Sequence, residues 1–300
     1  MPSVKALLFV LLGIFAALFC AAWVLELANR KKQWLPTSFQ AAIGCVTNFF
    51  DTLGIGSFAT TTTIYRLFRV VPDEKIPGTL NVGDTLPTVA QAFIYITIVQ
   101  VDVRTLVLLI GATVAGGWLG AGVVTRLPKR RIQIGMGLAL LAASALIIGK
   151  LLYGDPAASG AQGLEGSLLI VAMLGNFTFG ALMMIGVGAY APIMIMISLL
   201  GMNPKTAFPI MMGSCAFLMP IASLRFIRAS KYDAPAAIGL TLGGVPAVVI
   251  AAFLVRELPL DYVRWLVVVV VLYTAISTLF AARNSGTIIR PSTLDDSRGG

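Results

Sequence analysis

Residues 53–59 read Leu-Gly-Ile-Gly-Ser-Phe-Ala, and residues 185–191 read Ile-Gly-Val-Gly-Ala-Tyr-Ala, so one glycine-containing pattern occurs twice. Each copy lies within a long apolar stretch, residues 37–65 for the first and residues 166–200 for the second. Glycine-interrupted apolar segments at corresponding positions of two halves indicate the binding site of a membrane transporter. We therefore expect a duplicated chain with its site at the two interruptions.

The composition places the chain in a lipid bilayer. Only 12% of the residues are charged and 58% are apolar, against roughly 25% and 45–50% in soluble domains. Apolar runs of about 20 residues, each long enough to cross the hydrocarbon core as a helix, recur along the chain. The ordinary runs are residues 5–25, 80–100, 104–125, 132–152, 206–224, 235–255 and 262–282. The sequence predicts an all-α polytopic membrane protein, because the strands of a β-barrel alternate and are only about ten residues long.

The distribution of the basic residues predicts the orientation. If the seven ordinary runs cross the membrane and the two glycine-containing stretches each enter and return on one side, most of the 22 cations gather on one face. That face then holds both Arg30-Lys31-Lys32 and the basic cluster between Arg66 and Lys75, in agreement with the positive-inside rule. We expect a membrane protein with its N-terminus outside and its C-terminus in the cytoplasm. The net charge of +9 then reflects orientation and contact with the lipid bilayer, not nucleic-acid binding.

This topology predicts two inverted-topology repeats, each made of a glycine-broken returning hairpin and three transmembrane helices. An extra N-terminal transmembrane helix precedes them. Its apolar run continues beyond Cys20-Ala21-Ala22 and ends in cations, so we expect a retained span in place of a cleaved signal peptide. The expected units are the N-terminal helix 1–30, the first repeat 37–152, a hinge loop 153–166, the second repeat 167–283 and a disordered tail 284–300.

The sequence offers no cofactor or metal site. Its three cysteines have no paired spacing, and it contains no histidine, the commonest metal ligand. It has no GxxxxGK[ST] phosphate loop, and Gly54-x-Gly56 lacks the third glycine of a dinucleotide-binding fingerprint. We expect a protein that is not an enzyme and that carries neither a cofactor nor a metal.

Polar residues inside apolar spans are costly and indicate function. They cluster around the glycine pair of the first half and are sparser in the second, so we expect the first copy to do most of the binding. The repeat also aligns Asp84 with Ser214, which leaves the halves different by one carboxylate. The predicted substrate-binding residues are Asn48, Asp51, Thr52, Gly54, Gly56, Ser57, Thr60, Asn81, Asp84, Thr85, Asn176, Gly186, Gly188, Tyr190 and Ser214.

The glycines have two interpretations. A broken helix frees N–H groups at a half-helix N-terminus, where an anion can bind. Small residues also allow helices to pack closely in membranes. We favour the first interpretation for the two repeated glycine pairs. We favour the second for five glycines of residues 104–125, namely Gly111, Gly116, Gly117, Gly120 and Gly122.

Asp51 and Asp84 are the acids that we place deep in the apolar regions. Burial favours the protonated form of a carboxyl group, which would suit proton coupling. The alternatives are a carboxylate paired with an arginine or one that caps a broken helix. Asp84 follows Pro77 and Gly78 near an expected helix start, so capping and coupling both stay open for it. Asp51 has no cation near it in sequence and is the better coupling candidate.

The second half carries Gly186-x-Gly188, then Ala191-Pro192, then Asn-Pro-Lys-Thr-Ala at residues 203–207. Together with the first glycine pair, these motifs resemble the TauE/SafE family of sulfite exporters and related permeases, over residues 38–283. The chain departs from the family pattern in lacking three consecutive glycines and in carrying threonines where the first half commonly has a proline. The resemblance implies a permease of the bacterial inner (plasma) membrane that moves sulfite, a sulfonate or another small sulfur-containing anion, generally outward.

Our leading hypothesis is a secondary transporter that exports such an anion, bound at the midplane between the two broken hairpins, with proton coupling through Asp51 or Asp84 as an addition. Uptake, or transport of a carboxylate or a metal cation, is the alternative within transport. An intramembrane enzyme would need Asp51 and Asp84 to meet as an aspartyl pair, and a non-transporting membrane subunit is the remaining class. Oligomerisation stays open.

Overall fold

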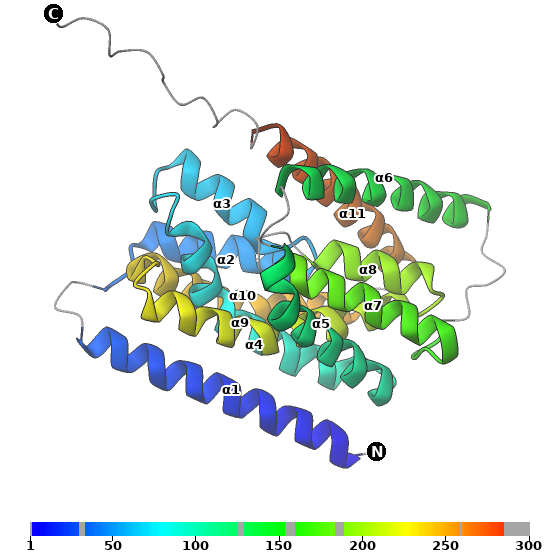
Figure 1. Cartoon of the computed structure of the whole chain (residues 1–300), viewed down its shortest axis with the longest axis horizontal. Coiled ribbons are helices and arrows are strands. Elements are labelled where there is room, and N and C mark those ends of the chain that lie inside the picture. Colours follow the sequence, from blue (N-terminus) through cyan, green and yellow to red (C-terminus); the bar gives the residue numbers. More distant parts are fainter. Residues whose placement is uncertain are drawn as a thin grey trace, which may run out of the picture.

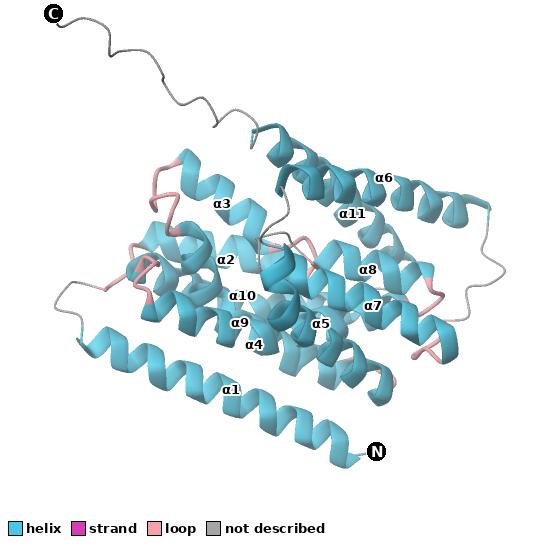
Figure 2. Cartoon of the chain, in the orientation of Figure 1, coloured by secondary structure: helices cyan, strands magenta, loops and turns pink. Residues whose placement is uncertain are grey.

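The computed structural model of the chain describes residues 2–29, 34–124, 129–153, 160–183, 189–257 and 260–284. Within these ranges the chain is helical, with no strand beyond an isolated bridge between Ala161 and Met202 (Figures 1 and 2). The helices are α1 (Pro2–Asn29), α2 (Ser38–Thr52), α3 (Ser57–Leu67), α4 (Ile76–Ile98), α5 (Val103–Val124), α6 (Lys129–Tyr153), α7 (Gly166–Met183), α8 (Tyr190–Leu199), the 3₁₀ turn η1 (Pro204–Thr206), α9 (Ala207–Arg228), α10 (Ala234–Glu257) and α11 (Leu260–Asn284).

Each of the seven ordinary apolar runs forms one helix, namely α1, α4, α5, α6, α9, α10 or α11. Four segments of the described chain are long and apolar enough to cross a membrane: Val4–Asn29, Gly166–Met183, Pro204–Arg228 and Ala234–Leu254. The prediction of an all-helical polytopic membrane protein is confirmed at this level.

Both glycine-containing stretches are interrupted helices. In the first, α2 ends and α3 begins around Gly54 and Gly56, whose φ angles of +96° and +83° lie in the left-handed region that glycine adopts without strain. In the second, α7 and α8 flank Gly186 and Gly188, which lie outside the described residues. In Figure 1, α2 runs from the left toward the centre and α3 returns to the left, whereas α7 runs inward from the right and α8 returns to the right.

The helices pack in pairs that link the two halves of the chain. The most extensive contacts join α2 to α10, α5 to α7, α4 to both α9 and α10, and α6 to α11. Residues 154–159 of the predicted hinge loop and all but the first residue of the predicted tail lie outside the described residues. Helix α1 contacts α9, and Trp23 at its C-terminal end donates a hydrogen bond from Nε1 to the Tyr232 hydroxyl at 3.2 Å.

Glycines set how closely the paired helices approach. A Cβ atom built on Gly243 of α10 would lie 1.9 Å from the carbonyl oxygen of Ala41 on α2. One built on Gly116 of α5 would lie 1.9 Å from the carbonyl oxygen of Phe177 on α7. Side chains larger than hydrogen would force these backbones apart, which is how small residues act in membrane helix pairs.

The five glycines that we expected to pack closely therefore differ in their surroundings. A Cβ atom on Gly116 or Gly117 would clash with a neighbour, at 1.9 Å and 2.6 Å respectively, so the packing interpretation holds for both. It is wrong for Gly111, where a Cβ atom would meet nothing within 4 Å. Gly120 and Gly122 lie where the surroundings of the side chains are not described.

Gly116→Ala should destabilise the protein, because its methyl group overlaps the α7 backbone and overpacking of this kind costs about 1–3 kcal/mol. Gly111→Ala on the same helix is the matched control and should be neutral or slightly stabilising, since alanine is the better helix former. Thermal unfolding of both purified variants in lipid nanodiscs measures the difference. Equal midpoints for the two variants would contradict the packing role of Gly116.

Candidate functional site

The break between α2 and α3 is closed by Asp51, in the last turn of α2. Its Oδ1 accepts a hydrogen bond from the Ser57 backbone N–H at 2.5 Å, and its Oδ2 accepts one from Gln91 Nε2 at 2.9 Å. The N-cap residue of α3 is Gly56, which has no side chain to receive that N–H. Asp51 therefore caps α3 from a distance and occupies the N–H group at the start of this half-helix.

Asp84 lies on the other side of Ser57. Its Oδ2 accepts the Ser57 hydroxyl at 3.3 Å, and its Oδ1 accepts Asn48 Nδ2 at 3.0 Å. Asp84 is in the interior of α4, so it does not cap that helix; the capping that we kept open for Asp84 is found at Asp51. No direct hydrogen bond joins the two carboxyl groups among the described contacts, as the proton-sharing pair of an aspartyl protease would require.

Gln91 and Tyr95 complete this network and were not predicted. Gln91 Nε2 also donates to the Thr52 hydroxyl at 2.9 Å, and the Tyr190 hydroxyl donates to Gln91 Oε1 at 3.4 Å. The Tyr95 hydroxyl donates to the backbone carbonyl of Thr52 at 2.9 Å. The signal was present in the sequence, because Asp84, Thr88, Gln91 and Tyr95 follow the spacing of one face of a helix.

A cavity of about 60 Å³ lies beside Asp51, where the two interrupted segments meet. One water needs about 10–15 Å³, so the space suits a small ion or a few waters. Residues of both halves line it: Asp51, Ile55, Gly56, Ser57, Phe58, Thr88, Met183, Ala189, Tyr190, Ala191, Cys215, Met219 and Thr274. The lining thus combines one carboxyl group and several hydroxyl groups with sulfur-bearing side chains.

The buried charges are of one sign. Asp51 and Asp84 are 2% and 1% exposed, and no lysine or arginine is among the buried side chains of the described residues. Their polar neighbours are the neutral Asn48, Ser57 and Gln91. An anion in the cavity therefore meets carboxyl groups without a compensating buried cation, which repel it when they are ionised.

The structure brings together seven of the predicted residues, which line the cavity or bond to its network. They are Asn48, Asp51, Thr52, Gly56, Ser57, Asp84 and Tyr190. Gly54 forms the break beside them but does not line the cavity, and a Cβ atom there would lie 2.3 Å from Met194. Gly186 and Gly188 lie outside the described residues.

Four of the five remaining predicted residues have other hydrogen-bond partners. Thr60 bonds back to the Ser57 carbonyl at 2.8 Å, and Asn81 bonds back to the Pro77 carbonyl at 2.8 Å. The side chains of Thr60 and Asn81 thus bond to backbone carbonyls of their own helices.

Thr85 and Asn176 instead link helices. The Thr85 hydroxyl lies 3.0 Å from that of Ser223 on α9, and the Thr113 hydroxyl on α5 donates to Asn176 Oδ1 at 3.1 Å. The Ser214 hydroxyl is buried without a hydrogen-bond partner in the described structure.

Comparison with protein families matches residues 2–147 and 168–298 to the family described as sulfite exporter TauE/SafE. The chain belongs to the TauE/SafE family. Its match begins at residue 2 and so includes α1, whereas the motifs suggested the resemblance only over residues 38–283. Neither the curated proteins nor the solved structures compared with the chain gave a match. Membership makes the chain a multi-pass membrane protein of a transporter family.

Asp51→Ala should destabilise this TauE/SafE protein more than Asp51→Asn does. Alanine leaves the Ser57 N–H and one of the two Gln91 N–H groups without acceptors, and each buried unsatisfied group costs about 1–3 kcal/mol. Asparagine keeps an oxygen for Ser57, and Gln91 can turn its own amide oxygen toward the new NH₂ group. Thermal unfolding in nanodiscs compares the two variants. If both lose the same stability, the capping role of Asp51 is refuted.

Proposed function

We propose that this TauE/SafE protein is a secondary transporter that exports a small sulfur-containing anion, such as sulfite or an organosulfonate, across the bacterial inner membrane. The observation that carries the proposal is the cavity between the two interrupted segments, which residues of both halves line. The family described as sulfite exporter supplies the substrate class. The hydroxyl groups of Ser57, Thr88 and Tyr190 line the cavity and could hydrogen-bond an oxyanion there.

We also propose that the two halves are inverted repeats that give alternating access. The helix pairs support this, because a repeat that matches α2 with α7 and α5 with α10 exchanges the α2–α10 pair with the α7–α5 pair. It also leaves the α4–α9 and α6–α11 pairs matched with themselves. The two hairpins, which enter from opposite ends of the bundle in Figure 1, fit the same relation. The N-terminus then lies outside and the C-terminus in the cytoplasm.

Proton coupling follows from the charges at the site. An anion can occupy a cavity beside Asp51 and close to Asp84 at low cost only when these carboxyl groups are neutral. Ser57 donates to both groups and therefore ties them into one unit. We propose that protons on these two residues move together with the anion.

A metal cation is the second candidate substrate, because carboxyl and sulfur groups both line the cavity. Divalent transition metals prefer clusters of histidine, cysteine and carboxylate ligands. No group of three such residues lies close enough to hold a metal in the described part of the chain. The arrangement therefore favours the anion.

In proteoliposomes, sulfite flux by the wild-type protein should rise by up to about a hundredfold when the compartment that supplies sulfite is acidified by one pH unit while both carboxyl groups are ionised, since protonation of each group changes tenfold per unit. Asp51→Asn and Asp84→Asn should each reduce this response to about tenfold or less, because each leaves one carboxyl group that can be ionised. Asp73→Asn is the matched control, since the Asp73 side chain is 68% exposed and pairs with Arg66 outside the bundle.

Two outcomes would count against the proposal. Flux of metal cations or carboxylates without flux of sulfite or sulfonates would refute the substrate class. Flux through Asp51→Asn that follows the pH gradient as the wild type does would remove Asp51 from the coupling mechanism.

A further inference from the structure

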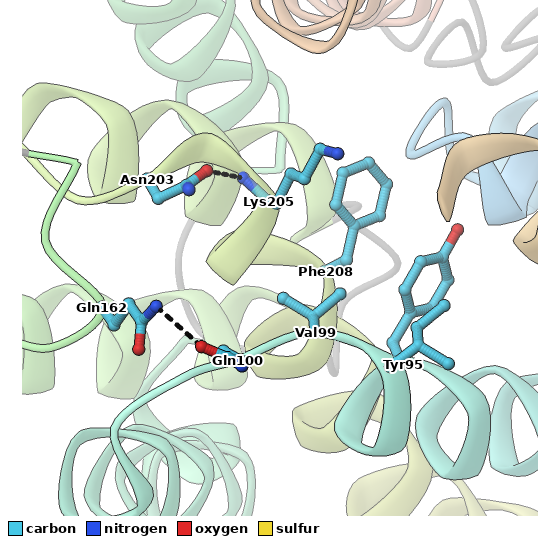
Figure 3. A pocket seen from close by; sticks show the side chains of 8 residues that line it. Tyr95, Val99, Gln100, Gln162, Asn203, Lys205 and Phe208 are labelled. Atoms are coloured by element: carbon cyan, nitrogen blue, oxygen red, sulfur yellow. Dashed lines mark hydrogen bonds between the residues drawn. The ribbon is translucent and has the colours of Figure 1, made fainter. Parts of the chain in front are cut away.

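A second and larger cavity, of about 140 Å³, lies at the end of the bundle where α4 ends and α9 begins (Figure 3). We call it the vestibule. Its lining includes Gln100, Gln162, Asn203 and Lys205 from the connecting segments, together with Tyr95 of α4 and Phe208 of α9. Gln100 and Gln162 are exposed at the surface of the protein, so the vestibule reaches solvent.

The polar groups of the vestibule suit a small oxyanion. Lys205 brings an ammonium group to the lining, and three side-chain amides accompany it. Asn203 Oδ1 accepts the Lys205 backbone N–H at 3.0 Å, which orients the NH₂ group of Asn203 away from that bond, and Gln162 Nε2 donates to Gln100 Oε1 at 3.2 Å (Figure 3). No acidic residue is among the described lining residues. Charged and amide donors of this kind bind oxyanions well.

Asp102, in the loop between α4 and α5, is held by its own helix terminus. Asp102 accepts the backbone N–H and the hydroxyl of Thr105, each at 2.8 Å, and so caps α5. Partial burial alone would raise the pKa of Asp102, but these hydrogen bonds and the nearby charge of Arg104 hold that pKa below its ordinary value. The carboxylate thus stays bound to the α5 terminus and does not line the vestibule.

Two residues that line the vestibule, Tyr95 and Phe208, form an aromatic pair. The rings of Tyr95 and Phe208 stack with centroids 5.0 Å apart and an interplanar angle of 22°, and both side chains are fully buried. Tyr95 also bonds to the carbonyl of Thr52, whose hydroxyl accepts Gln91, the partner of Asp51. Tyr95 therefore connects the aromatic pair to the hydrogen-bond network around Asp51.

At the opposite end of the α4–α9 pair, α4 touches the segment that follows α9. The repeat places Gly78 of α4 where α9 has Phe208, at the offset that relates Gly83 to Gly213. A Cβ atom on Gly78 would lie only 2.0 Å from the carbonyl oxygen of Lys231, so the two segments touch there. The Asp233 backbone N–H donates to the Thr79 hydroxyl at 2.9 Å beside this contact. One end of the α4–α9 pair is thus joined by close contacts, while the other end holds a cavity.

We propose that the vestibule is an anion-binding station, which holds a small oxyanion on Lys205 and the neighbouring amides, and that the Tyr95–Phe208 pair is the gate between it and the central cavity. In the proposed topology the vestibule lies on the outer face, so an exported anion reaches it after the central cavity. The identity of the anion rests on the proposed function, but the charge of the station and the position of the gate do not. Lys75, which the repeat aligns with Lys205, lies at the opposite end of the α4–α9 pair and serves as the matched control.

Thiol labelling tests the station without any transport. In a chain whose three native cysteines are replaced, Gln162→Cys is treated with an anionic sulfonatoethyl or a cationic trimethylammonioethyl methanethiosulfonate. Lys205→Gln should lower the ratio of the anionic to the cationic rate about fivefold, as loss of one nearby charge predicts. Lys75→Gln should leave the ratio unchanged. An unaltered ratio in Lys205→Gln overturns the station.

Native Cys215 tests the gate. It is 1% exposed and lines the central cavity, so with Cys20 and Cys45 replaced by serine it should resist the anionic reagent. Phe208→Ala should raise its labelling rate at least tenfold. Phe208→Leu, which keeps an apolar plug, and Phe9→Ala, which removes a ring stacked on Phe93 at the α1–α4 contact, should leave it protected. Protection of Cys215 in Phe208→Ala overturns the gate.

Flux separates this inference from the proposed function. If the wild type carries sulfite, Lys205→Gln should raise the KM for sulfite supplied at the vestibule face about fivefold at low ionic strength, with kcat unchanged. An unchanged KM there overturns the station. If the wild type carries no sulfite, the proposed function fails, and the two labelling experiments still decide on the station and the gate.

Discussion

A helix that breaks inside a membrane exposes backbone groups that lipid cannot satisfy, and the site of this protein depends on how that constraint is met. At the first break, the carboxyl group of Asp51 receives the Ser57 N–H that glycine cannot cap. The solution buries an ionisable group, which itself needs partners. Gln91 is one such partner, since it donates to Asp51. Ser57 also bonds to Asp84, and Asp84 accepts in turn from Asn48. The polar network is therefore a consequence of the break as much as of any ligand.

Much of the architecture could be predicted, because crossing a bilayer imposes a length and a hydropathy that the sequence displays directly. The repeated glycines likewise predicted where the two helices are interrupted and that Asp51 lies at the first interruption. The roles of Asp51 and Asp84 did not, since capping depends on which N–H a carboxyl group reaches in space. Gln91 and Tyr95 were missed because residues 80–100 were treated as an ordinary span, although their polar residues share one helix face.

The glycines also show that the surroundings of a residue in the folded protein could not be predicted from its type alone. Gly111 and Gly116 lie on one helix five residues apart, and five steps of about 100° place them on different faces. Only Gly116 faces α7, so identical residues have unlike surroundings. The vestibule could not be predicted at all, because its lining comes from segments around residues 100, 162 and 205 that only the folded chain brings together.

The pairing of two carboxyl groups through one serine has a consequence for the membrane voltage. Moving one elementary charge across a membrane voltage of 100 mV changes the free energy by about 2.3 kcal/mol. In the proposed mechanism, a doubly charged anion that travels with one proton on each of Asp51 and Asp84 carries no net charge. Such a cycle is electrically silent, and the potential across the membrane neither drives nor opposes it. A singly charged anion with two protons would instead move one positive charge.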